Sequence, residues 1–293
     1  MSWRITRRSV LASGAVVGLG GAAGSDPLGP DPRRIVSLNP CLDVILVHLA
    51  DRAQIAALSH YSHEPSSSSL GELGRTFPFT YESAEEVLAL RPDLVLTGRH
   101  SSPATRAALK RLGIRAELFG VPNTLEESLE QVRQVARAVY RPARGEALAA
   151  KIAAAVAVSA PPPGTPKLTA LIYQSGGFAS AQGTLMDDMM RRAGFENAAS
   201  RYGLKRTGNV PLENLIADPP DVLLAGETKP GAPTWADRVL NHPALSRVAH
   251  RMHRASFPQQ LTFCGGPVLI QTAQMLVRAR QGALTLRTQE GRA

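Results

Sequence analysis

The sequence contains few aromatic residues and little cysteine, and its positive charge is not gathered into runs. Phe, Trp and Tyr make up 5% of its 293 residues, and only two cysteines are present. The net charge of +9 includes Arg4, Arg7 and Arg8 near the start of the chain. Because the basic residues are scattered and few aromatic residues accompany them, no stripe has the character of a nucleic-acid-binding surface. We therefore expect no nucleic-acid partner.

Two common signatures of enzymes are missing from the glycine-rich stretch at residues 174–178. Ser175 lacks the glycine two positions before it that a nucleophile elbow requires. Gly176 and Gly177 lack the spaced glycines and the following Lys-Ser/Thr pair of a phosphate-binding loop. We therefore expect a protein that is not an enzyme and that carries no cofactor.

Residues 1–24 have the features of a twin-arginine export signal. Arg7 and Arg8 precede a weakly apolar stretch at residues 12–23, which is too short to be a stable membrane-spanning helix. Small residues at 22–24 suit a cleavage site, and no cysteine stands near it to carry a lipid. We expect a soluble periplasmic product. An ordinary export signal that happens to contain two arginines is the alternative, and it leads to the same compartment.

The two cysteines, Cys41 and Cys264, lie near opposite ends of the chain, and three roles are open to them. In an oxidising compartment an even number of cysteines favours a disulfide. The sequence does not show whether the two Cα atoms come within about 7 Å of each other. Two buried free thiols and a metal-ligating pair therefore stay as alternatives.

One stretch of the chain occurs twice. Residues 85–98 read EEVLALRPDLVLTG, and residues 213–226 read ENLIADPPDVLLAG. In each copy a short helical stretch runs into proline, and an aspartate (Asp93 or Asp221) opens an apolar run that ends in glycine. Such a run is typical of a strand buried on both faces of a parallel sheet. The repeat predicts two similar α/β lobes, although coincidence is the alternative because this joint is common.

The remaining strand and helix patterns divide the chain. We expect an N-terminal lobe at residues 33–141 and a C-terminal lobe at residues 166–287, each with a parallel-rich sheet flanked by helices. Residues 142–160 are rich in alanine and carry apolar residues at four-residue spacing. They predict a single long helix that connects the lobes, with a ligand cleft between the lobes.

Two further segments carry expectations about order. The polar, serine-rich segment at residues 60–80 is expected to be a long loop that is functional or mobile. The last helix is expected to end near Gln281, and residues after Arg287 to form a frayed tail.

The loops after the predicted strands are the expected binding region, because ligands of parallel α/β sheets bind beyond the carboxyl ends of the strands. There, Arg99 offers paired donors to an anionic group, and aromatic side chains offer flat apolar contact. The expected contacts of a larger ligand are Asn39, Tyr61, Arg99, His100, Gln174, Phe178, Glu227 and Trp235. The alternative is a bare metal ion held by His60, His63 and His100 with Glu227. For each residue alone, packing or surface exposure is the simpler explanation.

Three segments resemble a known family. Residues 34–43 (RIVSLNPCLD), the repeat copy at residues 85–98 and residues 264–267 (CGGP) are similar to the periplasmic substrate-binding proteins of ABC importers for iron chelates and cobalamin. The resemblance extends over residues 33–282. It implies two α/β lobes joined by one long helix, a ligand cleft between them and little closure.

The resemblance also implies a function and partners. The chain would be a monomer that captures a metal chelate, a ferric siderophore first and cobalamin second, and delivers it to an ABC permease. Family members dock onto the permease through one acidic residue on each lobe, and the matching residues are Glu85 and Glu213. A helix N-terminus would by itself favour these charges by about 0.3–1 kcal/mol. A disulfide between Cys41 and Cys264 would tie the lobes across the cleft.

The alternative to a chelate-binding protein is a zinc- or manganese-binding protein of similar architecture.

Overall fold

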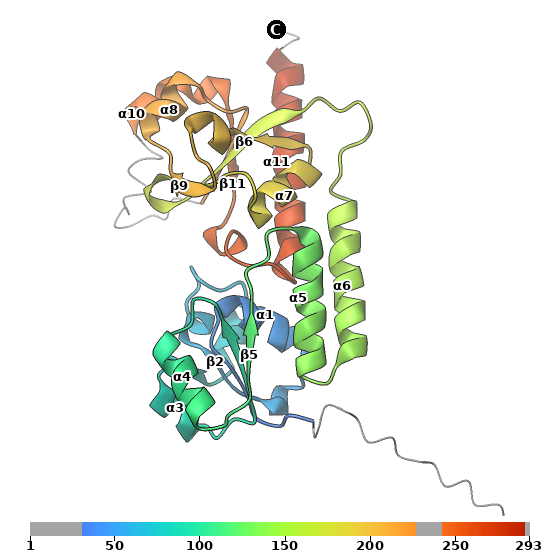
Figure 1. Cartoon of the computed structure of the whole chain (residues 1–293). Helices are drawn as coiled ribbons and strands as arrows, with labels where there is room; N and C mark the ends of the chain where they lie inside the picture. The colour runs from blue at the N-terminus through green and yellow to red at the C-terminus, as the bar shows by residue number, and fades with distance from the viewer. Residues whose placement is uncertain (1–30, 227–241, 291–293) are drawn as a thin grey trace, which may run out of the picture. The chain divides into compact units, whose positions relative to one another are not determined.

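The computed structural model of the protein describes residues 31–226 and 242–290. Within these residues the chain forms two α/β lobes, each built on a parallel sheet with helices packed against it (Figure 1). This confirms the two-lobed α/β fold that the repeat predicts. No helix in this part of the chain combines the length and the apolar composition needed to cross a bilayer.

The sheet of the first lobe has the strand order β3-β2-β1-β4-β5, and all its neighbouring strands are parallel. The loops that follow these strands therefore begin at one edge of the sheet. Its strands are β1 (Ile35–Ser37), β2 (Ile55–Ser59), β3 (Phe79–Thr80), β4 (Leu94–Gly98) and β5 (Ala116–Phe119). Its helices are α1 (Pro40–Leu49), α2 (Glu72–Arg75), α3 (Ala84–Ala89), α4 (Pro103–Arg111) and α5 (Leu125–Ala138).

The second lobe has a parallel sheet of order β11-β10-β6-β8 and a separate antiparallel ribbon of β7 and β9. Its strands are β6 (Leu168–Tyr173), β7 (Phe178–Ser180), β8 (Phe195–Asn197), β9 (Thr207–Asn209), β10 (Val222–Ala225) and β11 (His253–Ser256). Its helices are α7 (Leu185–Arg192), α8 (Leu212–Ala217), α10 (Pro243–Val248) and α11 (Val268–Glu290). Short 3-10 helices complete both lobes: η1 (Arg52–Gln54), η2 (His60–His63), η3 (Ser175–Gly177), η4 (Ala198–Tyr202), η5 (Ala249–Arg251) and η6 (Gln259–Leu261).

The two copies of the repeat occupy equivalent places in the two sheets. Helix α3 leads into β4, which pairs with β1, and α8 leads into β10, which pairs with β6. Asp93 accepts hydrogen bonds from the amides of Arg33 and Arg34, just before β1, at 2.8 and 3.0 Å. Asp221 accepts one from the Thr169 amide in β6 at 2.7 Å. The aspartate of each copy therefore holds the start of the neighbouring central strand.

A single long helix, α6 (Pro142–Ala157), connects the lobes and lies alongside α5 (Figure 1). Its buried edge includes Ile152 and Val156, as the apolar spacing predicts. At Gly145 an added Cβ would lie 2.3 Å from Ala136 Cβ of α5, so this close approach requires glycine. Helix α6 also contacts α11, so it packs against elements of both lobes.

The apolar core continues from one lobe into the other. Its largest buried cluster includes Ile35 and Leu46 of the first lobe, Ile152 of α6, and Ile172 and Leu269 of the second lobe. Pulling the lobes apart would expose part of this cluster, at a cost of about 25 cal/mol for each Å² of apolar surface. The shared core therefore favours small relative movements over wide opening.

Two expectations about order are wrong. The segment at residues 60–80 is not a structureless loop, because it contains η2, α2 and β3, and β3 pairs with β2. Helix α11 does not end near Gln281 and continues to Glu290. Ala283 is buried in the core and Arg287 forms an ion pair with Asp221, so tertiary contacts hold the last turns that the polar sequence alone leaves unsupported.

Candidate functional site

A cleft of about 650 Å³ lies between the two lobes. On the first lobe it is reached by the residues that follow β1, β4 and β5, and on the second lobe by β7, the start of α7 and the start of β9. Its volume is in the range of sites that bind small molecules, about 300–1,000 Å³. Its lining includes Asn39, Cys41, Leu42, Arg99, His100, Phe119, Val121, Asn123, Gln131, Ser180, Thr184, Leu185, Met186, Arg206, Thr207 and Phe263.

Three of the residues predicted to contact a ligand line this cleft: Asn39, Arg99 and His100. The Asn39 side chain also caps α1, since its Oδ1 accepts from the amides of Cys41 and Leu42 at 2.9 and 3.3 Å. Its Nδ2 stays close to Gly98, where an added Cβ would lie 2.8 Å away. Asn39 therefore combines a structural role with a place at the cleft.

The other predicted contacts are placed differently. Tyr61, Gln174 and Phe178 are not among the described residues that line this cleft. Tyr61 belongs to an aromatic group after β2, Gln174 precedes η3 and Phe178 begins β7. Glu227 and Trp235 lie outside the described residues.

Several lining residues escaped prediction. Phe119 ends the parallel strand β5, and Val121 and Asn123 follow it, so the rule that ligands bind at the carboxyl ends of parallel strands was sufficient to find them. Arg206 and Thr207 reach the cleft through the antiparallel pairing of β7 with β9, for which the sequence carries no clear alternation signal. Their place depends on tertiary structure.

Polar contacts between the lobes border the cleft. The Leu125 amide, at the start of α5, donates to Asp188 Oδ2 of α7 at 2.9 Å. Arg192 of α7 binds Glu126 of α5 through two hydrogen bonds at 2.7 and 2.8 Å. Both contacts run from the first turn of α5 in the first lobe to side chains of α7 in the second lobe. They hold the two lobes together.

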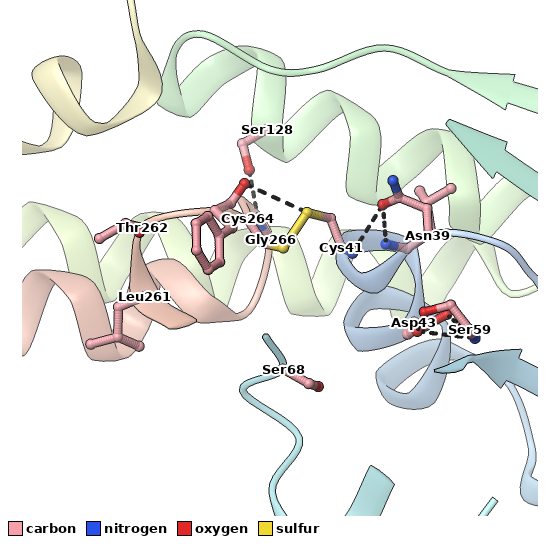
Figure 2. The surroundings of a disulfide bond; sticks show 12 residues. Asn39, Cys41, Asp43, Ser59, Ser68, Ser128, Leu261, Thr262, Cys264 and Gly266 are labelled. Atoms are coloured by element: carbon pink, nitrogen blue, oxygen red, sulfur yellow. Dashed lines mark hydrogen bonds between the residues drawn. A yellow bond between two sulfur atoms is a disulfide. The ribbon is translucent and has the colours of Figure 1, made fainter. Parts of the chain in front are cut away.

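Cys41 and Cys264 form a disulfide, and their Cα atoms lie 5.0 Å apart (Figure 2). Cys41 is in the first turn of α1, and Cys264 precedes α11. Of the three roles that the sequence leaves open, the structure contains the bonded pair. Because Cys41 also lines the cleft, the bond ties the two lobes at the cleft.

The segment after Cys264 is packed tightly against the first lobe. The Gly266 amide donates to Ser128 Oγ of α5 at 2.7 Å (Figure 2). An added Cβ on Gly265 would lie 2.4 Å from Ser128 Oγ, and one on Gly266 would lie 2.8 Å from Ile45 Cγ1 of α1. Two consecutive glycines therefore allow the disulfide-linked segment to fit between α1 and α5.

Aromatic and imidazole rings form a group after β2 and β3. The His60 ring lies 3.9 Å from the Tyr61 ring and 5.2 Å from the Tyr81 ring, measured between centroids. His60 Nδ1 is 3.9 Å from Glu82 Oε1, and His63 Nε2 is bonded to the Phe77 carbonyl at 2.9 Å. In residues 31–226 and 242–290, no three or more His, Cys, Asp or Glu side chains are arranged to hold a metal ion.

Two carboxyl groups near these rings, one fully buried and one partly buried, have raised pKa values. Asp43 of α1 has no exposed surface, and burial raises its pKa to about 7, although hydrogen bonds from Ser37 and Ser59 oppose the shift. Ser59 donates through both its hydroxyl and its amide to the Asp43 carboxyl, at 2.5 and 3.2 Å. Burial also raises the pKa of Glu82 to about 7. The charge on Glu82 adds to the rise at Asp43.

Glu85 and Glu213 are exposed and stand in the first turns of α3 and α8. Neither has an ion-pair partner among the described residues. The repeat therefore presents one exposed carboxylate from an equivalent helix on each lobe. The pKa of the Tyr173 hydroxyl is raised, first by burial and then by the nearby charge of Glu213.

Curated relatives of the chain are cobalamin-binding proteins of Halobacterium salinarum. One is 24% identical over 206 residues, which cover 68% of this chain and 55% of the relative. The chain thus spans about half the length of the curated relatives it matches.

Solved structures with a similar fold include proteins that bind tetrapyrroles. The apo form of the periplasmic heme-binding protein RhuT from Roseiflexus sp. RS-1 has a TM-score of 0.66 and 23% identity, covering 87% of this chain and 98% of that one. The periplasmic vitamin B12-binding protein BtuF of Vibrio cholerae has a TM-score of 0.65 and 16% identity, covering 87% and 98%. At these identities the likeness establishes the fold alone.

The family itself is established from the sequence. Residues 35–249 match the periplasmic binding protein family. The matched region covers more than half of the chain and includes both copies of the repeat. The chain therefore belongs to the periplasmic binding protein family.

Proposed function

We propose that this protein is the substrate-binding component of an ABC importer, working outside the cytoplasmic membrane, in the periplasm. The observation that carries the proposal is the cleft between the lobes, to which both lobes contribute polar and apolar side chains. A binding protein needs such a cleft and no catalytic group. Membership of the periplasmic binding protein family supports the same role.

The proposed cargo is a metal chelate. The sequence resemblance favours a ferric siderophore first and cobalamin second. The names of the relatives support chelates in general, since they include cobalamin-binding and heme-binding proteins. A bare zinc or manganese ion has no support among the described residues, because His60, His63 and His100 do not come together there.

Native mass spectrometry of the mature protein tests this proposal. The protein would be mixed with a pool of ferric siderophores, hemin, cyanocobalamin and free divalent metals, and a retained adduct of chelate mass is expected. Thr207→Trp should obstruct part of the cleft and weaken retention of the adduct, whereas Thr288→Trp, on the exposed side of α11, should retain it. Retention of a bare metal ion alone, or of nothing, would contradict the proposal.

The proposed partner is a membrane permease that both lobes contact. Glu85 and Glu213 are the proposed docking residues, because they are exposed, lack ion-pair partners among the described residues and occupy equivalent places in the two lobes. Two like charges placed in this way suit a partner with two-fold symmetry and basic residues. Their helix N-termini also favour a negative charge, and the two roles are compatible.

Charge reversal separates docking from ligand binding. Glu85→Arg combined with Glu213→Arg should lower ligand transport at least about tenfold, since like charges would then face each other at the interface. Ligand affinity should not change, because neither residue lines the cleft. Glu196→Arg, which reverses an exposed charge on β8, is the control. Unimpaired transport by the double variant would disprove the docking role.

A further inference from the structure

The cleft contains cationic side chains and no acidic ones among its described lining residues. Arg99 and His100 follow β4 on the first lobe, and Arg206 precedes β9 on the second lobe. The two arginines therefore approach the cleft from opposite sides. Such a distribution of charge favours a ligand that carries negative charge.

The charges of these arginines are not neutralised within the described structure. Arg192, beside the cleft, binds the carboxylates of both Asp188 and Glu126. Arg99 has no comparable ion pair in residues 31–226 and 242–290. Arg206 donates to a neutral acceptor, the amide oxygen of Asn123. A planar guanidinium without a carboxylate partner is well suited to bind a carboxylate through two parallel hydrogen bonds.

The bond between Arg206 and Asn123 crosses from one lobe to the other. Asn123 is held in place on its own lobe, because its amide and its Nδ2 donate to Glu127 Oε2 at 2.7 and 3.2 Å. Glu127 is not part of the cleft lining. A ligand carboxylate is a stronger acceptor than the Asn123 amide oxygen, because it is ionised and can accept two parallel hydrogen bonds from the guanidinium. Such a ligand would take Arg206 from Asn123 and would itself bridge the lobes.

The rest of the lining is suited to an apolar body between the charged ends. Phe263 and Val121 present large exposed apolar surfaces, and Leu185 and Met186 lie at the start of α7. Resting on the proposed function, we propose that the chelate is an anion with at least two carboxylates, one bound by Arg99 with His100 and another by Arg206. Neutral chelates would lack both contacts.

Two matched pairs of probes test this inference. They also distinguish the two classes of ligand that could carry the carboxylates, a tetrapyrrole and a polycarboxylate. Hemin would be compared with hemin dimethyl ester, which lacks both carboxylates, and ferric citrate with a neutral ferric trihydroxamate. Affinity would be measured by tryptophan fluorescence quenching or by calorimetry. The acidic member of one pair should bind about tenfold to a hundredfold more tightly than its neutral partner. The pair that shows this difference identifies a tetrapyrrole or a polycarboxylate ligand.

Variants connect the preference to the two arginines. Arg99→Gln and Arg206→Gln should each weaken the acidic probe about tenfold and leave the neutral probe unchanged. Arg111→Gln, an exposed arginine of α4 that does not line the cleft, should change neither. Thermal unfolding of each variant checks that it is folded.

The possible outcomes separate this inference from the proposed function. Equal binding of acidic and neutral probes, or arginine variants that match the wild type, would overturn the inference and leave a chelate-binding protein. Tight binding of a neutral chelate alone would do the same. If no chelate in either pair, nor cyanocobalamin, binds at all, both the inference and the proposed function are overturned.

Discussion

Cys41 and Cys264 are bonded across the junction of the two lobes, although 223 residues separate them in the sequence. Their bond lies beside a hydrogen bond from Gly266 to Ser128, so the second lobe is held to α1 and to α5 at almost the same place (Figure 2). The cleft is next to this junction, since Cys41 and Gly265 both line it. The short segment from Cys264 to Gly266 therefore affects both the relative movement of the lobes and the stability of the protein.

Loss of the disulfide should destabilise the protein. A Cys41→Ser, Cys264→Ser variant should have a free energy of unfolding about 2–5 kcal/mol lower, because the bond closes a very long loop in the unfolded chain. Urea denaturation measures the change. Reductant should move the wild type toward the variant and should not affect the variant. Identical midpoints for the oxidised wild type and the variant would contradict the prediction. Small-angle scattering should also show greater lobe movement after reduction.

Gly266→Ala should be more damaging than an ordinary glycine replacement. Gly266 has a φ of +64°, and an added Cβ would lie 2.8 Å from Ile45 Cγ1. We expect a loss of about 1–2 kcal/mol for the backbone conformation and about 1–3 kcal/mol for overpacking. Gly203 is a matched control, because its φ is +82° and no atom lies within 4 Å of an added Cβ. Thermal unfolding should show the larger loss at Gly266, and equal losses would refute the packing account.

The parts of the fold that the sequence predicts well are those set by local patterns. The helix, proline and aspartate of each repeat copy identify α3 with β4 and α8 with β10, because an uncharged run of this length between such signals is typical of a buried strand. Alanine-rich composition identifies α6 in the same way. Short strands such as β3 and β8 were missed, since two or three residues carry no period and depend on their partners.

The candidate site was only partly predictable for a related reason. Arg99 and His100 follow a recognisable parallel strand, so the carboxyl-end rule finds them. Arg206 reaches the cleft through the β7–β9 ribbon, and its partner Asn123 is 83 residues away in the chain. Tyr61 follows a strand of the same sheet as Arg99 and yet is not among the cleft residues. The carboxyl-end rule identifies the edge of the sheet at which a ligand binds. It does not identify which part of that edge faces the other lobe.

Stability should fall as the pH rises, owing to Asp43. The ordinary pKa of this carboxyl is 3.8, and burial raises it to about 7 in the folded protein. Between these values the folded state binds the proton and the unfolded state does not, so the free energy of unfolding decreases by up to about 1.4 kcal/mol per pH unit. The contribution is fully present below the lower value and is lost once the pH has passed the higher one.

Asp43→Asn isolates this effect. The difference in free energy of unfolding between the variant and the wild type, measured by urea denaturation from pH 4 to pH 8, should move in favour of the variant as the pH rises. Glu82→Gln should shift the wild-type transition to lower pH, because the Glu82 charge contributes to the raised pKa of Asp43. A difference between the Asp43→Asn variant and the wild type that does not vary with pH would show that Asp43 titrates normally.

Arg280 of α11 should be a major contributor to stability, although it forms no ion pair within the described residues. The side chain is 5% exposed, and its Nη1 donates to the carbonyl oxygens of Ser159 and Ala193. These carbonyls stand at the ends of α6 and α7, where a cation is favoured by the helix dipoles. Burial lowers the pKa of Arg280, which is consistent with a guanidinium removed from water.

Arg280→Met keeps most of the side-chain volume and removes both hydrogen bonds. Two buried carbonyl groups would be left without a donor, at about 1–3 kcal/mol each, so we expect the free energy of unfolding to fall by about 2–4 kcal/mol. Arg278→Met is the matched control, since Arg278 is exposed on the same helix and should change stability by no more than about 0.5 kcal/mol. Urea denaturation of the two variants measures the contrast. If the two substitutions cost the same, Arg280 does not join the ends of α6 and α7 in the way that its hydrogen bonds indicate.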